Sequence, residues 1–289
     1  EKCRYVTTPV DCQPMPASHP FRNMTKKRNQ PTGTRIARPV PRDVTIRLNE
    51  AMSLMAHKRW NQALEILEPL NQRYPRRVDV LAALLDVYQA VGDTQQFQFT
   101  CEQLLRERPE DPELLLVLGG LYMTNLRPAL ALRTFRHFLE RWPDHKRARD
   151  VRKSVNRLAD KLPGILIEMG LAGEEDLELA ALHEEAQSLM ERGQFAAARH
   201  AAEKLLSLRP GFVPALNNLS QIYFIEGNRE RAIEVAQQVL ALDPANYHAL
   251  SNLARYLCLS GRVKEAGEWA ARLKAVKSER MDVWVKKAE

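Results

Sequence analysis

Few residues in this sequence combine the types and spacing that catalysis or metal binding requires. His183 and Glu184 begin a run that resembles the zinc-binding pattern HExxH, but Gln187 stands where the second histidine must be. One imidazole cannot replace two ligands at i and i+4. The sequence also has no Walker loop, no dinucleotide-binding glycine pattern, no GxSxG turn and no CxxC pair. We therefore predict no enzyme activity, no metal and no cofactor for this chain.

Four cysteines are too few for a disulfide framework in a chain of 289 residues. Cys3 and Cys12 are close enough in sequence to form a disulfide, to stay as free thiols, or to bind a metal together with His19. Cys101 and Cys258 fall within helical patterns, and we interpret them as packing residues. The redox state of the N-terminal pair is left open.

A period of 34 residues organises most of the chain. It is marked by the prolines Pro75, Pro109 and Pro143, by Pro210 and Pro244, and by the glycines Gly193, Gly227 and Gly261. Within each period, apolar residues recur at helical spacing in two runs separated by a short polar turn. Proline closes the second run because it lacks an amide hydrogen and clashes with the preceding turn. The elements that must position any functional side chain are therefore pairs of helices.

At this spacing the chain resembles the tetratricopeptide repeat (TPR) family. The resemblance is carried by Leu219, Tyr223, Gly227, Ala232, Val239 and Pro244, and by their counterparts one period away. Repeats begin near Val44, Val78, Pro112, Leu179, Val213 and Tyr247. The resemblance implies an all-α fold, a right-handed superhelical solenoid of antiparallel helix pairs. It also implies a concave groove that binds a protein or a peptide.

We expect five parts along the chain. Residues 1–43 form a basic, proline-rich tail that is disordered or extended, because it has no hydrophobic period with which to bury a core. Residues 44–143 hold repeats one to three, and residues 179–277 hold repeats four to six. Residues 144–178 are a degenerate repeat or a hinge. Residues 278–289 are a polar capping helix or, as we favour, the start of a seventh repeat truncated from a longer protein.

The segment 144–178 is irregular in charge as well as in pattern. Seven basic residues crowd a predicted helix over 146–161, which we expect to end at Pro163 and Gly164. From Leu162 to Glu191 there is no Lys or Arg, but there are eight acidic residues. One interpretation is a solvated, self-complementary surface, in which each ion pair contributes about 0–1 kcal/mol. The other is a docking point between two blocks of repeats.

The family resemblance also indicates where a ligand would bind. The first helix of each repeat lines the concave face, where residues at i, i+3, i+4 and i+7 form one stripe. In peptide-binding members an asparagine at the sixth position of the repeat holds the ligand backbone, since a carboxamide offers a donor and an acceptor together. That position is Asn49, Ala83, Val117, Glu184, Asn218 and Asn252 in successive repeats. We predict a peptide-binding site formed by Asn49, Asn217, Asn218, Gln221, Phe224, His248, Asn252 and Arg255.

The amino-terminal repeats have a different lining, which is apolar and rich in methionine. It consists of Leu48, Met52, Met55, Leu116, Val117 and Met123. Methionine adapts to irregular partners, so this lining favours binding of a helix or strand; the alternative is ordinary core packing.

The net charge of +7 is unevenly distributed. The tail, residues 1–43, has nine basic and three acidic residues, which leaves 34 basic and 33 acidic residues in the remainder. An acidic partner is therefore to be expected at the tail. Phosphate-driven nucleic-acid binding by the tail is a weaker alternative, because aromatic residues for base stacking are not interleaved with the charges.

No stretch is long and apolar enough to span a bilayer, and we expect a cytoplasmic protein, with a removed signal peptide as the alternative. The leading hypothesis is a protein-interaction scaffold that binds a peptide in its groove. The second is a regulatory or substrate-recruiting region of a larger enzyme whose catalytic domain follows Glu289.

Overall fold

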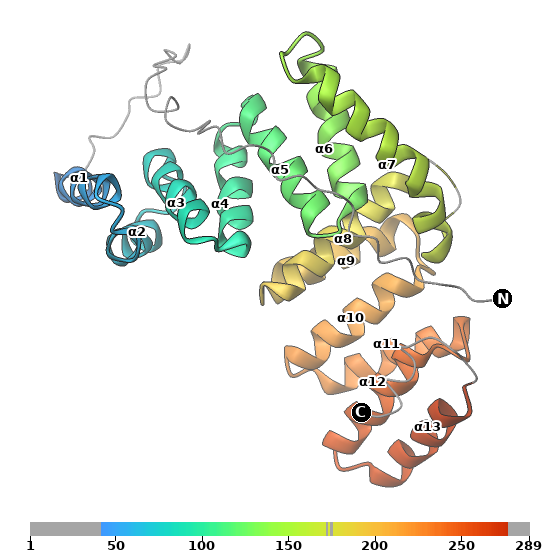
Figure 1. The fold of residues 1–289 in the computed structure, drawn as a ribbon. Helices are drawn as coiled ribbons and strands as arrows, with labels where there is room; N and C mark the ends of the chain where they lie inside the picture. Colours follow the sequence, from blue (N-terminus) through green and yellow to red (C-terminus); the bar gives the residue numbers. More distant parts are fainter. Residues whose placement is uncertain (1–41, 172, 174–175, 277–289) are drawn as a thin grey trace. The chain divides into compact units, whose positions relative to one another are not determined.

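The computed structural model describes residues 42–276 except 172, 174 and 175, and this part consists of thirteen helices without a strand (Figure 1). The helices are α1 (Arg42–Ala56), α2 (Trp60–Arg73), α3 (Val78–Val91), α4 (Thr94–Glu107), α5 (Pro112–Thr124), α6 (Pro128–Arg141), α7 (Ala148–Glu168), α8 (Leu177–Glu191), α9 (Phe195–Leu208), α10 (Val213–Ile225), α11 (Arg229–Leu242), α12 (Tyr247–Leu259) and α13 (Val263–Ala275). The all-α prediction is confirmed.

The chain divides into two compact units, and the division falls inside α6. Among the described residues, unit 1 comprises residues 42–126 and Thr134–Arg149, and unit 2 comprises Arg127–Arg133 and residues 150–276. In unit 1 each of the helices α1 to α5 contacts the next one, and in unit 2 the same holds from α8 to α13. Short turns connect these helices, so each unit is built from antiparallel helix pairs, as the period predicts.

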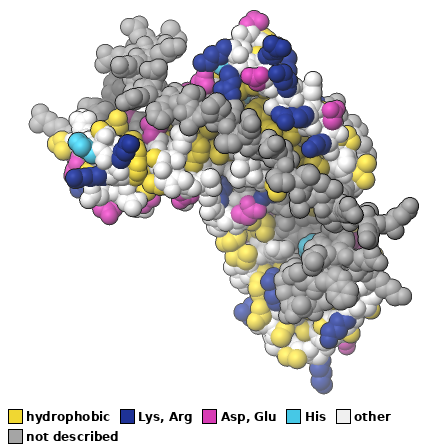
Figure 2. Space-filling view, viewed as in Figure 1, with side chains coloured by type: hydrophobic (Ala, Val, Ile, Leu, Met, Phe, Trp, Pro, Cys, Tyr) yellow, Lys and Arg dark blue, Asp and Glu magenta, His cyan; other side chains and the backbone are white. Residues whose placement is uncertain are grey.

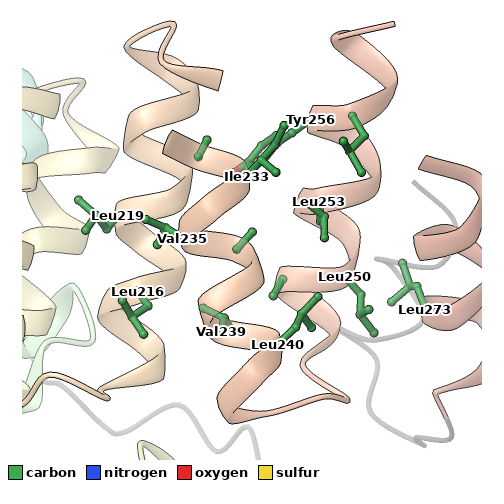
Figure 3. Packing of buried hydrophobic residues seen from close by; sticks show 14 of the residues in the cluster. Leu216, Leu219, Ile233, Val235, Val239, Leu240, Leu250, Leu253, Tyr256 and Leu273 are labelled. Atoms are coloured by element: carbon green, nitrogen blue, oxygen red, sulfur yellow. The ribbon is translucent and has the colours of Figure 1, made fainter. Parts of the chain in front are cut away.

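The core of unit 2 lies between the two helices of each pair and between neighbouring pairs (Figure 3). Leu216 and Leu219 of α10 face Val235 and Val239 of α11, because residues three or four apart share one side of a helix. Burying each such side chain contributes about 1.5–3 kcal/mol. The buried Ser220 also joins the two helices by a hydrogen bond, because its Oγ donates to a main-chain carbonyl of α11 at 2.9 Å.

The turn after each first helix requires a left-handed backbone. Gly193, Gly227 and Gly261 have φ of 69°, 85° and 79°. Glycine adopts this conformation without the steric cost that a Cβ brings, which explains why the period preserves it. The corresponding turns of unit 1 are at Lys58, Gly92 and Leu126, with φ of 58°, 78° and 54°. Two of those turns therefore hold the same conformation without glycine.

Helix α7 differs from the sequence prediction. The basic helix was expected to end at Pro163 and Gly164, but it continues to Glu168 with Pro163 inside it. Leu162 and Leu166 lie one turn apart on either side of the proline and are 3% and 2% exposed. Their burial compensates for the missing hydrogen bond, which otherwise destabilises a helix by about 3 kcal/mol.

The first helix begins at Arg42, inside the segment that we assigned to the tail. Asp43 accepts a hydrogen bond from the Tyr74 hydroxyl at 3.2 Å and pairs with Arg73 at 3.4 Å, so tertiary contacts extend the helix to this point. The rest of the expected tail, including Cys3 and Cys12, lies outside the described residues. The same is true of the expected capping helix or seventh repeat over 278–289.

Candidate functional site

Seven of the eight predicted site residues lie on α10 and α12, two helices of unit 2 that contact each other. Both are first helices of their pairs. The residues on α10 are Asn217, Asn218, Gln221 and Phe224, and those on α12 are His248, Asn252 and Arg255. The eighth, Asn49, is exposed on α1 and belongs to unit 1. The structure therefore places seven of the residues on two neighbouring first helices, and the contacts that it shows among them join Arg255 to Phe224 and to Asn252.

An aromatic and arginine cluster joins the two helices. The rings of Phe224 and Tyr256 stack with centroids 4.2 Å apart and an interplanar angle of 14°. The guanidinium of Arg255 lies 5.8 Å from the first ring and 5.5 Å from the second, and its Nη2 donates to Asn252 Oδ1 at 3.4 Å. These contacts hold an exposed cation beside a buried carboxamide. Sequence reasoning missed Tyr256, although it follows Asn252 by four residues and so shares its face.

Asn217 has a structural role that the sequence did not indicate. Its side chain is 8% exposed, and Nδ2 donates at 3.3 Å to Oδ1 of Asn246, the N-cap that accepts the Ala249 amide of α12. It thereby supports the start of the next first helix. On α10 and α12, the buried amide atoms Asn217 Oδ1 and Asn252 Nδ2 have no hydrogen-bond partner among the described residues. Because both atoms are inaccessible to solvent, each can bind a ligand or a water only when its side chain moves.

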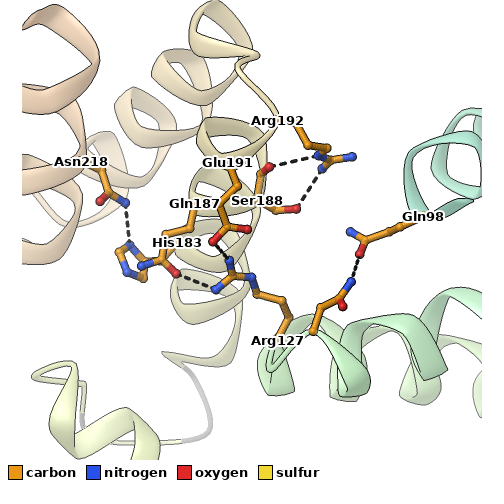
Figure 4. A network of polar contacts seen from close by, with 9 residues as sticks. Gln98, Arg127, His183, Gln187, Ser188, Glu191, Arg192 and Asn218 are labelled. Atoms are coloured by element: carbon orange, nitrogen blue, oxygen red, sulfur yellow. Dashed lines mark hydrogen bonds and ion pairs between the residues drawn. The ribbon is translucent and has the colours of Figure 1, made fainter. Parts of the chain in front are cut away.

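Asn218 is partly buried, and its Nδ2 lies 3.4 Å from Nδ1 of His183 on α8 (Figure 4). The imidazole is 7% exposed and packs edge-on against Phe212, with centroids 5.8 Å apart. Burial, with a smaller contribution from the charge of Arg127, lowers the pKa of His183 to about 4. The ring is therefore neutral at pH 7. The sequence drew attention to His183 only as half of a failed zinc motif.

The sixth position of the preceding repeat, Glu184, faces the start of α6. Its carboxylate accepts the amides of Ala129 at 3.1 Å and Leu130 at 2.8 Å, and so caps that helix. Burial raises the pKa of Glu184, against the opposing effect of these hydrogen bonds. Arg127 donates to Gln187 at 3.1 Å and pairs with Glu191 on the same helix (Figure 4). This part of α8 is thus occupied by the chain itself.

Acidic residues around α8 are paired with arginines outside α7. Arg133 donates to Glu178 at 3.0 Å and lies 3.8 Å from Glu185, while Arg209 contacts Asp176 at 2.7 Å. Lys and Arg side chains gather on the surface in the region of α7 (Figure 2). Lys153, Arg157 and Lys161 of this helix are exposed. These contacts do not decide between our two interpretations of the segment, because they do not include Glu174 and Glu175, which lie outside the described residues.

The remaining residues of the predicted site and of the apolar lining make fewer contacts that bear on ligand binding. Gln221 is half-buried on α10, and the His248 ring lies 4.1 Å from that of Tyr247. In the apolar lining of unit 1, Met52 is 42% exposed, whereas Leu116 is 4% exposed and is part of the core. Leu48, Met55, Val117 and Met123 are half-buried. The lining is therefore partly core and partly surface.

The residues that the structure describes contain no group of three or more His, Cys, Asp or Glu side chains that could hold a metal ion. None of their helices combines the length and the apolar character that crossing a membrane requires.

Models of the tetratricopeptide repeat match the sequence over residues 54–121, 183–246 and 223–282, which is more than half of the chain. The chain belongs to the tetratricopeptide repeat family. Within this TPR chain, α10 to α13 all fall in matched segments, so the candidate site lies on recognised repeats.

Solved structures similar to this TPR chain include the following three. PilW, described as a type IV pilus biogenesis factor, is 17% identical, with 85% of this chain and 99% of that chain covered and a TM-score of 0.37. MamA from Desulfovibrio magneticus RS-1 is 16% identical, with 69% and 94% covered and a TM-score of 0.37. YrrB, described as having an unusual peptide-binding site, is 18% identical, with 71% and 88% covered and a TM-score of 0.29.

No curated protein matches the sequence. With identities and TM-scores this low among the solved structures, the family assignment rests on the repeat models.

Proposed function

We propose that unit 2 binds an extended peptide segment of a partner protein along α10 and α12. The observation that carries this proposal is the pair of asparagines at the sixth position of neighbouring repeats, each with unused hydrogen-bonding capacity. Asn252 is 4% exposed and its Nδ2 is buried without a partner among the described residues, so it can donate to a ligand only when the side chain turns outward; Asn218 contacts His183 through Nδ2 and leaves its oxygen for another group. A carboxamide with a free donor or acceptor pairs with a peptide bond irrespective of the side chain.

Side-chain selection is assigned to the aromatic and arginine cluster. Phe224 is half-buried and offers an apolar surface. Arg255 is exposed, is held in place by the two rings, and can form a charge-assisted hydrogen bond with a carboxylate. The expected ligand is therefore an extended segment with an apolar and an acidic residue.

The proposed activity is binding and not a reaction. Tetratricopeptide repeats form protein-interaction scaffolds, and the sequence has no catalytic motif. The partner is a protein or a peptide; its identity is a matter for experiment.

The test uses the full chain and a random-peptide phage library. Peptides retained by the immobilised protein are synthesised with a fluorescent label, and their affinities are measured by polarisation. The double variant Asn218→Ala/Asn252→Ala is expected to bind them about tenfold more weakly, because two net hydrogen bonds of about 0.5–1.5 kcal/mol each are lost.

The matched control is Asn61→Ala/Asn156→Ala, which removes two exposed helical asparagines from α2 and α7. It should leave the affinities unchanged. Circular dichroism must show both variants to be folded. Equal affinity of the wild type and the Asn218/Asn252 variant for every retained peptide would contradict the proposed site.

A further inference from the structure

The contact between His183 and Asn218 restricts both side chains. They come from neighbouring first helices, α8 and α10, and their contact atoms are Nδ1 of the ring and Nδ2 of the amide, 3.4 Å apart (Figure 4). A carboxamide nitrogen can only donate, so Nδ1 must be the acceptor. The ring proton is then on Nε2. With the ring proton on Nε2, the reversed amide would place Oδ1 against the lone pair of Nδ1, which is repulsive; the reversed amide pairs only with the opposite tautomer, in which Nδ1–H donates to Oδ1.

The surroundings of His183 keep its imidazole ring uncharged. Phe212 packs edge-on against the ring, and the ring is 7% exposed. The adjacent carboxylate, Glu184, is engaged with the first amides of α6 and is not available to the imidazole as an ion-pair partner. The charged group that acts on the ring from the start of α6 is Arg127, which Gln187 and Glu191 hold in place. A cation nearby disfavours a second positive charge.

We infer that His183 is a positioning residue that fixes the orientation of the Asn218 carboxamide, so that its oxygen accepts a hydrogen bond from a main-chain N–H of the bound segment. This inference rests on the proposed function. The fixed carboxamide selects for a ligand N–H, because it presents only its oxygen to the bound segment. A freely rotating carboxamide would present either its oxygen or its nitrogen. The ligand must carry an unsubstituted amide at this point, and proline or an N-methylated residue there is rejected.

The first experiment needs no ligand. In the ¹⁵N-labelled full chain, the imidazole nitrogen shifts of His183 should identify the neutral Nε2–H tautomer. The side-chain NH₂ signal of Asn218 should move in His183→Leu and return toward its wild-type position in His183→Asn, whose amide oxygen can replace Nδ1 as acceptor. The control His200→Leu changes an exposed histidine of α9 and should leave the signal in place. A proton on Nδ1 would overturn the inference.

The second experiment uses the peptides retained from the phage library, each resynthesised with one N-methyl group at successive positions. In the wild type, one N-methyl position should weaken binding about tenfold or more, since the Asn218 oxygen is then left without its donor. In His183→Leu this sensitivity should largely disappear, and His183→Asn should restore it.

The two proposals fail in different ways. If His183→Leu keeps the full N-methyl sensitivity, the positioning role is wrong, while binding at Asn218 and Asn252 stands. If Asn218→Ala/Asn252→Ala binds as tightly as the wild type, the proposed function is wrong whatever the tautomer, and the selectivity inferred from it is wrong as well.

Discussion

At the scale of single residues, His183 and Glu184 show how adjacent side chains come to serve different helices. One contacts α10 through Asn218, and the other caps the start of α6. Both are buried, and burial shifts their pKa values toward the neutral form, downward for the imidazole and upward for the carboxyl. Their effects on stability therefore have opposite dependences on pH.

The histidine gives a testable pH dependence. Its pKa is about 4 in the folded chain and about 6.5 when unfolded, so between these values the unfolded state binds more protons. The contribution of His183 to the free energy of unfolding is at its maximum above pH 6.5. It falls by on the order of 3 kcal/mol as the pH is lowered from 6.5 to 4. Urea unfolding of the wild type and His183→Asn at a series of pH values measures it.

The comparison is made as a difference between the two proteins, because Glu184 and the other titrating groups are common to both and largely cancel. The wild type should lose stability relative to His183→Asn as the pH falls through this window. A constant difference from pH 7 to pH 4 would show that His183 is not held neutral by the fold.

At the scale of elements, the left-handed turns of unit 1 predict opposite changes in the free energy of unfolding for two glycine substitutions. Leu126 has φ of 54° and is 81% exposed, so its replacement by glycine relieves backbone strain and loses little burial. We expect Leu126→Gly to raise the free energy of unfolding by about 1 kcal/mol. Gly92→Ala, at φ of 78° with no atom within 4 Å of the added Cβ, should lower it by about the same amount.

Chemical denaturation measures both changes. Because the space around Gly92 is open, a loss of stability in Gly92→Ala reports the backbone conformation alone. Changes of the same sign in the two variants would contradict a shared left-handed turn.

These turns also explain what the sequence could predict. Glycine and proline spacing was sufficient for the helix pairs, and α3, α5, α10 and α12 begin at the residues where we placed the start of a repeat. Lys58 and Leu126 could not be recognised as left-handed, because neither residue type favours that conformation. The continuation of α7 past Pro163 depends on the burial of Leu162 and Leu166, which becomes visible only in the fold.

For the candidate site, the sequence predicted which helix positions share a face, but not the contacts that the side chains make there. The repeat register places Asn218 and Asn252 on neighbouring helices, as we expected. It does not reveal that Asn217 supports the cap of α12, or that Glu184 at the same register faces α6, because these contacts depend on which neighbour fills the space beside each helix. Nor does it assign Asn49 to a different unit, which follows from the division inside α6.

At the scale of the whole molecule, the uneven distribution of charge predicts that binding to a polyanion depends on residues 1–41. Residues 1–41 hold eight basic and two acidic residues, so the chain without them has 35 basic and 34 acidic residues. We expect the full chain to be retained on a polyglutamate resin and to elute as salt is raised, since salt screens such attraction. The chain starting at Arg42 should pass through at low salt.

This truncation leaves Asp43, with its contacts to Arg73 and Tyr74, in place, and thermal melting is the control for folding. Equal retention of the two chains would place the polyanion-binding charge on the helices, where α7 would be the first candidate.

The cap that Glu184 provides for α6 has a consequence for how the chain is made. The carboxylate comes 55 residues after the amide of Ala129 and 54 after that of Leu130. Ribosomes add about 5–20 residues per second, so roughly 3–11 s separate the synthesis of these amides from that of their acceptor. Until then the first turn of α6 must satisfy its donors in another way. The cap of α6 therefore forms only after α7 and the first half of α8 have been translated.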